Sequence, residues 1–111
     1  MAAVLPTDLF SGYTSDGTNI TIPIASLPAL STAEANATTG NGMEVLRALI
    51  DAAHGSISGL ATEAKPVRAS LTKNNPTMAS GAGVTPGTQR QTYTASFDLQ
   101  PTGLEMASEP S

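Results

Sequence analysis

Hydrophobic residues recur at helical spacing in one long stretch of the chain, from Asn41 to Leu60. Intervals of three and four residues place an apolar set on one side of a predicted helix. This set is Leu46, Leu49, Ile50, Ala53, Ile57 and Leu60. The polar set on the other side is Glu44, Arg47, Asp51, His54 and Ser58. Asn41, with Glu44 three residues later, predicts a capped helix start, and Gly55 and Gly59 predict that the helix ends between them.

Three shorter stretches alternate apolar and polar residues, a period of two that is typical of half-buried strands. They span residues 19–25, 67–73 and 90–99. Pro23 has no backbone N–H to donate, so the first of these strands belongs at a sheet edge or ends its pairing early. The third is the clearest, and we expect it at the centre of the sheet.

Two short patterns predict local turns. Asp16 followed by Gly17 is typical of a turn that leads into a strand. In the loop over residues 26–40, Ser31 with Glu34 has the spacing of a capping box and predicts one short helical turn.

These elements predict an α+β fold, in which an antiparallel sheet of about three strands, in the order 1-3-2, packs on one main helix. Residues opposite each other in such a sheet share a face, and Arg68 opposite Asp98 is one register that satisfies this rule. The predicted body covers residues 18–100 and contains a long hairpin loop at 74–89. Residues 1–17 form an extended N-terminal arm, and residues 101–111 form a flexible or partner-ordered tail.

Apolar side chains in the arm, the loop and the tail need to be covered. The arm either packs on its own domain or reaches onto a neighbouring chain, and the loop either folds back or inserts into a partner. We predict partner contacts at these positions: Leu5, Leu9, Phe10, Tyr13, Met78, Val84, Leu104 and Met106.

Composition excludes several kinds of function. The net charge is −4 with only five basic residues, which disfavours binding to nucleic acid or to an anionic membrane surface. No apolar run approaches the roughly 20 residues of a membrane span, and the N-terminus lacks a signal-peptide pattern, so we expect synthesis in a cytoplasm. The absence of cysteine and the single histidine remove disulfides, thiolate chemistry and most zinc sites, and we expect no cofactor or metal.

The strongest candidate for catalysis is His54, which lies three residues after Asp51 and so neighbours it on the helix. A hydrolase would also need Ser56 or Ser58 as a nucleophile within hydrogen-bond reach and an oxyanion hole. We interpret these residues instead as a solvated helix face. The glycines at 81–87 join two predicted strands rather than a strand and a helix, and therefore predict a flexible loop rather than a phosphate site.

Three segments together form a wider pattern: SDGTNITIPIASLPAL, then STAEANATTGNG before the helix, and RQTYTASFDLQ near the end. This pattern resembles short proteins encoded among the virion structural genes of tailed bacteriophages, cyanophages included. The resemblance covers roughly residues 15–100 and carries over no functional residue.

The resemblance implies a virion protein present in many copies, most simply a capsid cement or decoration protein that bridges subunits of the major capsid protein and contacts copies of itself. A neck, tail or baseplate accessory protein is the first alternative. A small enzyme or ligand-binding domain is the second.

Overall fold

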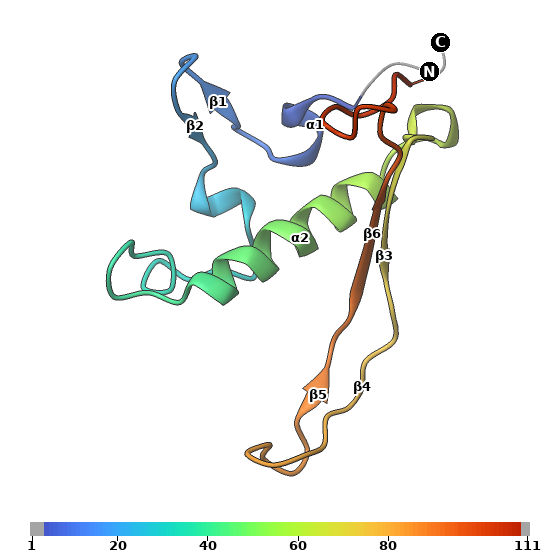
Figure 1. Cartoon of the computed structure of the whole chain (residues 1–111). Helices are drawn as coiled ribbons and strands as arrows, with labels where there is room; N and C mark the ends of the chain where they lie inside the picture. Colours follow the sequence, from blue (N-terminus) through green and yellow to red (C-terminus); the bar gives the residue numbers. More distant parts are fainter. Residues whose placement is uncertain (1–3, 110–111) are drawn as a thin grey trace. The chain divides into compact units, whose positions relative to one another are not determined.

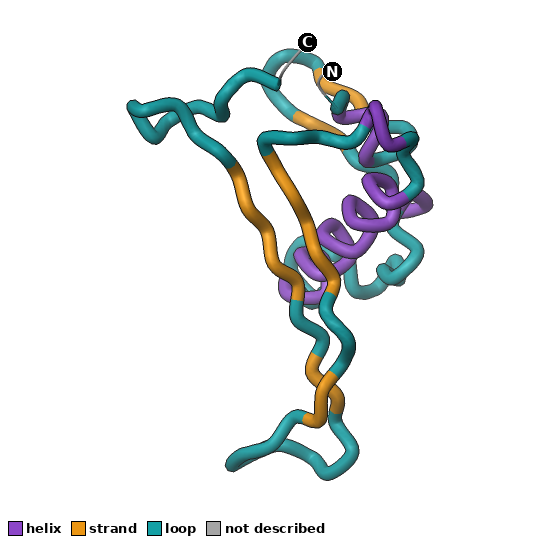
Figure 2. The backbone as a smooth tube through the Cα atoms, turned by 90° about the vertical axis from the view of Figure 1, so that its right-hand side faces the viewer, coloured by secondary structure: helices purple, strands orange, loops and turns teal. Residues whose placement is uncertain are grey.

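The computed structural model describes residues 4–109 and confirms an α+β fold with one main helix (Figures 1 and 2). The first three residues of the predicted arm and the last two of the predicted tail lie outside the described residues. The chain divides into two compact units. Within the described range, the first comprises residues 4–66 with Glu109, and the second comprises residues 67–108.

The main helix, α2, spans Gly42–Ser58 and begins and ends as predicted. The Asn41 side chain caps it by accepting hydrogen bonds from the backbone N–H groups of Met43 (3.1 Å) and Glu44 (3.2 Å). The other bond of the expected capping box, from the Asn41 N–H to the Glu44 carboxylate, is replaced by other interactions of both groups. The Glu44 carboxylate pairs with Arg47 at 3.0 Å, and the Asn41 N–H donates to the carbonyl of Glu34 at 2.9 Å.

The helix packs through a different face from the predicted one. Ala48 is only 1% exposed, and Val45, Leu49 and Ala52 pack against the same cluster. Of the predicted apolar stripe, only Leu49 belongs to this set. One residue step turns a helix by about 100°, so the contact face is rotated from the predicted stripe toward the small side chains of Ala48 and Ala52. These small residues let the covering segment approach the helix closely.

The hydrophobic core lies in the first unit, between α2 and the segment that precedes it. Among the described residues, the buried hydrophobic side chains are Leu27 (4% exposed), Leu30 (9%) and Ala48. Partly buried neighbours surround them: Phe10, Ile22, Ala29, Ala35, Val45, Leu49 and Ala52. The core is therefore very small, and burial of apolar area in the free chain stabilises this unit only modestly.

Short elements flank this core. They are the helix α1 (Pro6–Leu9), the strands β1 (Thr14–Ser15) and β2 (Ile20–Thr21), and the 3-10 turns Ile24–Ser26 and Thr62–Ala64. Phe10, in the predicted N-terminal arm, packs against the core cluster of its own unit. The Ser56 hydroxyl on α2 also donates to the Leu9 carbonyl at 2.7 Å. The described part of the arm is thus held on its own unit.

The first predicted strand is shorter than expected and pairs with a different partner. β2 pairs antiparallel with β1, with Thr14 opposite Thr21. The predicted turn at Asp16 joins them, because its carboxylate accepts from the N–H groups of Thr18 (2.8 Å) and Asn19 (2.7 Å). After Thr21 the pairing stops ahead of Pro23, as expected of a residue without an N–H.

In the second unit, β3 (Ala69–Lys73) pairs antiparallel with β6 (Tyr93–Phe97), and the two lie side by side in Figure 1. Ala69 lies opposite Phe97, which places Arg68 opposite Asp98 as in the register named from the sequence. The Asp98 N–H donates to the Arg68 carbonyl at 2.7 Å, and the two side chains approach within 3.8 Å. This pairing is confirmed.

The single three-stranded sheet in the order 1-3-2 is wrong. The described residues form three separate two-stranded sheets, β1-β2, β3-β6 and β4-β5, and β6 is not the centre of a larger sheet. β2 pairs locally with β1 because closing the short Asp16 turn costs much less conformational entropy than closing a long loop to β6.

The predicted long loop at 74–89 contains further pairing. β4 (Thr77–Met78) pairs with β5 (Gln89–Arg90), so the strands continue outward along one hairpin with a loop at its tip (Figure 2). Residues 74–76 oppose residues 91–92, an extra residue on one strand that makes a β-bulge. The bulge includes Pro76, which cannot donate to a ladder.

The described part of the predicted tail folds back within the second unit. Residues 98–100 pair with 105–107, with a bridge between Leu99 and Met106 and a bond from the Ala107 N–H to the Asp98 carbonyl (2.9 Å). Gly103 adopts a φ of 77°, which a tight return of this kind requires. The Arg68 guanidinium donates to the Ser108 carbonyl at 3.3 Å, so one side chain connects the hairpin base with this segment.

A capping box stabilises the loop before α2, as predicted. The Ser31 N–H donates to the Glu34 carboxylate at 2.9 Å, and the Glu34 N–H donates to the Ser31 hydroxyl at 3.2 Å. The backbone hydrogen bond from Ser31, followed by the hydroxyl, lowers the pKa of Glu34. The backbone hydrogen bonds from Asn19 and Thr18 lower the pKa of Asp16 in the same way.

We expect the first unit to lose stability as the pH falls below about 4. A carboxyl whose pKa is lower in the folded state stabilises that state above its unfolded pKa, and this contribution disappears as the pH falls through the folded pKa. Urea midpoints of the wild type and of Glu34→Gln at pH 7 and pH 3 measure the effect. Gln keeps a hydrogen-bonding side chain but does not titrate. The urea midpoint of Glu34→Gln should therefore fall less between pH 7 and pH 3 than that of the wild type. Equal falls in the two midpoints would show that Glu34 does not cause the loss of stability in acid.

Candidate partner-binding groove

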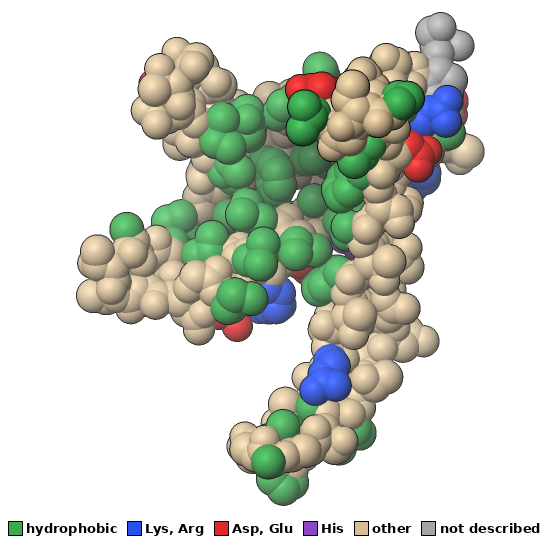
Figure 3. All heavy atoms as spheres, in the orientation of Figure 1, with side chains coloured by type: hydrophobic (Ala, Val, Ile, Leu, Met, Phe, Trp, Pro, Cys, Tyr) green, Lys and Arg blue, Asp and Glu red, His purple; other side chains and the backbone are tan. Residues whose placement is uncertain are grey.

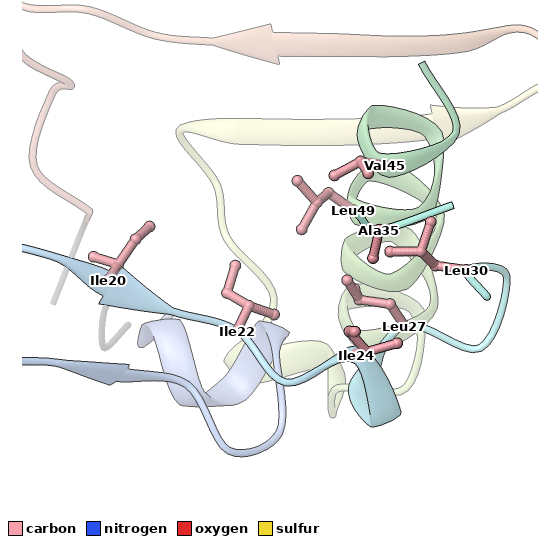
Figure 4. A pocket seen from close by; sticks show the side chains of 8 residues that line it. All are labelled: Ile20, Ile22, Ile24, Leu27, Leu30, Ala35, Val45 and Leu49. Atoms are coloured by element: carbon pink, nitrogen blue, oxygen red, sulfur yellow. The ribbon is translucent and has the colours of Figure 1, made fainter. Parts of the chain in front are cut away.

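A groove lined only by aliphatic side chains opens on the surface of the first unit (Figure 4). Its volume is about 300 Å³. We call it the aliphatic groove, and its lining is Ile20, Ile22, Ile24, Leu27, Leu30, Ala35, Val45 and Leu49.

Three parts of the chain build the groove. The isoleucines at 20, 22 and 24 follow the alternation noticed in the sequence, and Ile20 lies at one end of the row in Figure 4. Leu27 and Leu30 form its buried floor, since both belong to the core. Val45 and Leu49 project from successive turns of α2 and complete the lining. Ile20 is 61% exposed, so the groove is open to solvent at that end.

The lining decides what the groove can bind. It offers no side-chain hydrogen-bond donor, acceptor or charge, and burying an unpaired polar group there would be costly. Its volume lies at the lower limit of small-molecule sites, which also carry a few placed polar groups. The arrangement therefore suits one or two apolar side chains of another polypeptide segment.

A second groove, of about 350 Å³, lies near α1. Its lining is Leu9, Ser11, Ser26, Pro28, Asp51, Ala52, Gly55 and Ser56. It includes two residues of the hypothetical hydrolase, Asp51 and Ser56, but not His54. Because the Ser56 hydroxyl donates to the Leu9 carbonyl at 2.7 Å, its hydrogen bond serves to hold α1. A nucleophilic serine would instead bond to a general base.

The predicted partner-binding residues fall in both units, and none of them lines the aliphatic groove. Leu5, Met78, Leu104 and Met106 are exposed. Leu9, Tyr13 and Val84 are half-buried, and Phe10 packs on the core.

Sequence reasoning missed the groove because it assigned Ile20, Ile22 and Ile24 to one face of a sheet. The sequence does contain a signal for the groove, because Leu27 and Leu30 continue the row of isoleucines at a spacing of three. That spacing indicates a turn of helix-like backbone after the alternating residues, which brings the two sets together.

No protein-family model matches the chain. No curated protein and no solved structure matches it either. Within residues 4–109, no helix has both the length and the apolar character needed to cross a membrane. The same residues contain no group of three or more histidine or carboxylate side chains placed to hold a metal ion. The function must therefore be inferred from the surfaces of the two units.

Proposed function

We propose that the protein is a structural component of a tailed-phage virion, and specifically a capsid cement protein that binds the major capsid protein. The observation that carries this proposal is the imbalance between a very small core and a large set of exposed apolar side chains. The class of particle is taken from the resemblance of the sequence pattern to short phage virion proteins, which stays a prediction from the sequence.

The imbalance is large for a chain of this size. Against its three buried hydrophobic residues, the described part of the chain exposes a much longer set. This set is Leu5, Ile20, Ile24, Met43, Leu46, Val67, Met78, Phe97, Leu99, Leu104 and Met106. Figure 3 shows hydrophobic side chains gathered over the first unit on the face in view. Exposed apolar side chains gathered on one face of a unit in this way mark contact with another chain.

The second unit offers a different kind of contact. Among the described residues its hairpin is two strands wide, so no third strand lies along either outer edge. One face presents the hydroxyls of Ser70, Thr72, Thr94 and Ser96, which lie opposite one another in pairs. An edge of this kind pairs with an added strand from another protein.

In a shell, these surfaces would act passively. Contacts that span adjacent capsid subunits form only after assembly, and a ligand that binds one state alone stabilises that state by mass action. Weak contacts repeated by symmetry then add up to a large effect on the particle. We propose no catalytic step for the chain.

Binding to empty shells of the phage that encodes the chain tests the proposal. We expect purified chain to sediment with the shells, to saturate at many copies per shell, and to raise the temperature at which they dissociate. Binding to a few sites at one vertex would instead support a neck or tail protein. Absence of binding to shells and to tails would contradict a virion role.

A further inference from the structure

Charge is unevenly distributed between the first unit and the long hairpin of the second. Residues 67–97, which form the long hairpin, contain three basic residues and no acidic one: Arg68, Lys73 and Arg90. Residues 4–66 contain six acidic residues, Asp8, Asp16, Glu34, Glu44, Asp51 and Glu63. Their basic residues are Arg47 and Lys65. Arg68 already pairs with Asp98, so Lys73 and Arg90 supply the positive charge of the outer hairpin. This charge is complementary to the net negative first unit of another copy.

The outer part of the hairpin also carries an apolar side chain suited to the aliphatic groove. Met78 on β4 is 66% exposed and lies opposite Gln89. Figure 3 shows hydrophobic side chains at the tip of the hairpin and a basic side chain along it. Methionine is flexible and polarizable, so it fills irregular apolar spaces well.

We propose that the hairpin tip of one copy binds the aliphatic groove of a second copy, with Met78 as the inserted side chain. Arg90 lies opposite Thr77, on the other face of the narrow ribbon from Met78. Its charge therefore steers the tip toward the acidic first unit, while Met78 makes the contact. The partner of the aliphatic groove is thus a second copy of the chain. The role of this contact in a particle rests on the proposed function.

Crosslinking the purified chain tests the proposal, and the absence of native cysteine removes background reaction. Met78→Cys and Ile24→Cys replace an exposed tip residue and a partly exposed groove residue. Mixed in equal amounts with a short bismaleimide, the two variants should give a crosslinked pair containing one of each. Thr102→Cys, at an exposed position outside the predicted partner contacts, mixed with Ile24→Cys is the matched control and should give little product.

The double variant, with both substitutions in one chain, separates a second copy from the same copy. Products of two or more chains support the proposal, whereas a crosslinked monomer at low concentration means that the tip fills its own groove and overturns it. A lack of mixed product at high concentration also overturns it. These experiments use the chain alone, so a failure here is distinct from a failure to bind shells.

Sedimentation equilibrium gives the size of the effect. Met78→Asp should raise the dissociation constant of self-association at least about tenfold, because a carboxylate would enter an apolar groove. Thr102→Asp, at an exposed polar position of the second unit that is not among the predicted partner contacts, should leave it unchanged. Raising the salt from about 0.05 M to about 0.5 M should weaken association. The proposed contact would be contradicted if the two aspartate variants had equal dissociation constants, or if the dissociation constant did not depend on salt.

Discussion

Gly40→Ala should destabilise the first unit by roughly 2–4 kcal/mol, a large share of the stability of a small domain. A Cβ at this position would overlap the carbonyl oxygens of Glu34 and Asn36. Both oxygens are backbone atoms held in the turn, so the new atom cannot be accommodated by a rotamer change. The Gly40 N–H donates to the Asn36 carbonyl (3.0 Å), and the Asn41 N–H donates to the Glu34 carbonyl (2.9 Å). Relief of the overlap breaks both bonds.

The consequence extends to α2 because Asn41 is its N-cap. Loss of a cap typically costs a further ~1 kcal/mol. Urea unfolding followed by helical circular dichroism measures the effect. Gly42→Ala is the matched control, since a Cβ there meets nothing within 4 Å, and it should be neutral or slightly stabilising. A Gly40→Ala midpoint equal to that of Gly42→Ala would contradict the close approach.

Leu27→Ala should cost about 2–5 kcal/mol, the second large effect. Leu27 is 4% exposed and is one of the few buried side chains of the core. It also lies in the floor of the aliphatic groove, so its removal enlarges the groove and leaves its neighbours with fewer contacts. Leu30 is the other large buried side chain among the described residues, so little packing remains to compensate for the loss.

Leu104→Ala provides the comparison for this substitution. Leu104 is 85% exposed, and its truncation should change the stability of the free chain by no more than about 0.5 kcal/mol. Thermal unfolding of the two variants and the wild type measures the difference. If Leu27→Ala unfolds at the same temperature as Leu104→Ala, the core does not lie where the structure places it.

The elements that could be predicted from the sequence are those set by neighbouring residues. Asn41 caps α2, Asp16 forms its turn, and Ser31 with Glu34 forms the capping box, because each uses side chains within three residues of the backbone groups that they satisfy. Alternation limited the register of the long hairpin to pairings that keep each side chain on its face, and the observed pairing of Arg68 with Asp98 is one of these.

The sheet topology could not be predicted because several pairings satisfy the same alternation. Ile20 and Thr21 were expected beside the third strand, yet they pair with Ser15 and Thr14 across a short turn. Sequence alternation indicates which residues share a face but not which strand lies alongside. The outcome depends on loop-closure entropy and on Pro23, which ends the pairing early.

The aliphatic groove required the three-dimensional structure for a related reason. Ile22, Leu30 and Leu49 come from three separate segments, and each has an ordinary role in its own local pattern. Their convergence depends on the close approach of the loop before α2 to the helix, which Ala48 permits. A helical wheel alone favoured the neighbouring stripe with larger side chains.

The central claim is that other chains cover the exposed apolar surfaces of this protein in an assembled particle. Under the proposed virion role, quantitative mass spectrometry of purified virions tests it most directly, with the major capsid protein as the internal reference. The account predicts that the chain is present in fixed, high proportion to the capsid protein. Complete absence of the chain from purified particles, while it accumulates as a monomer in the infected cell, would contradict it.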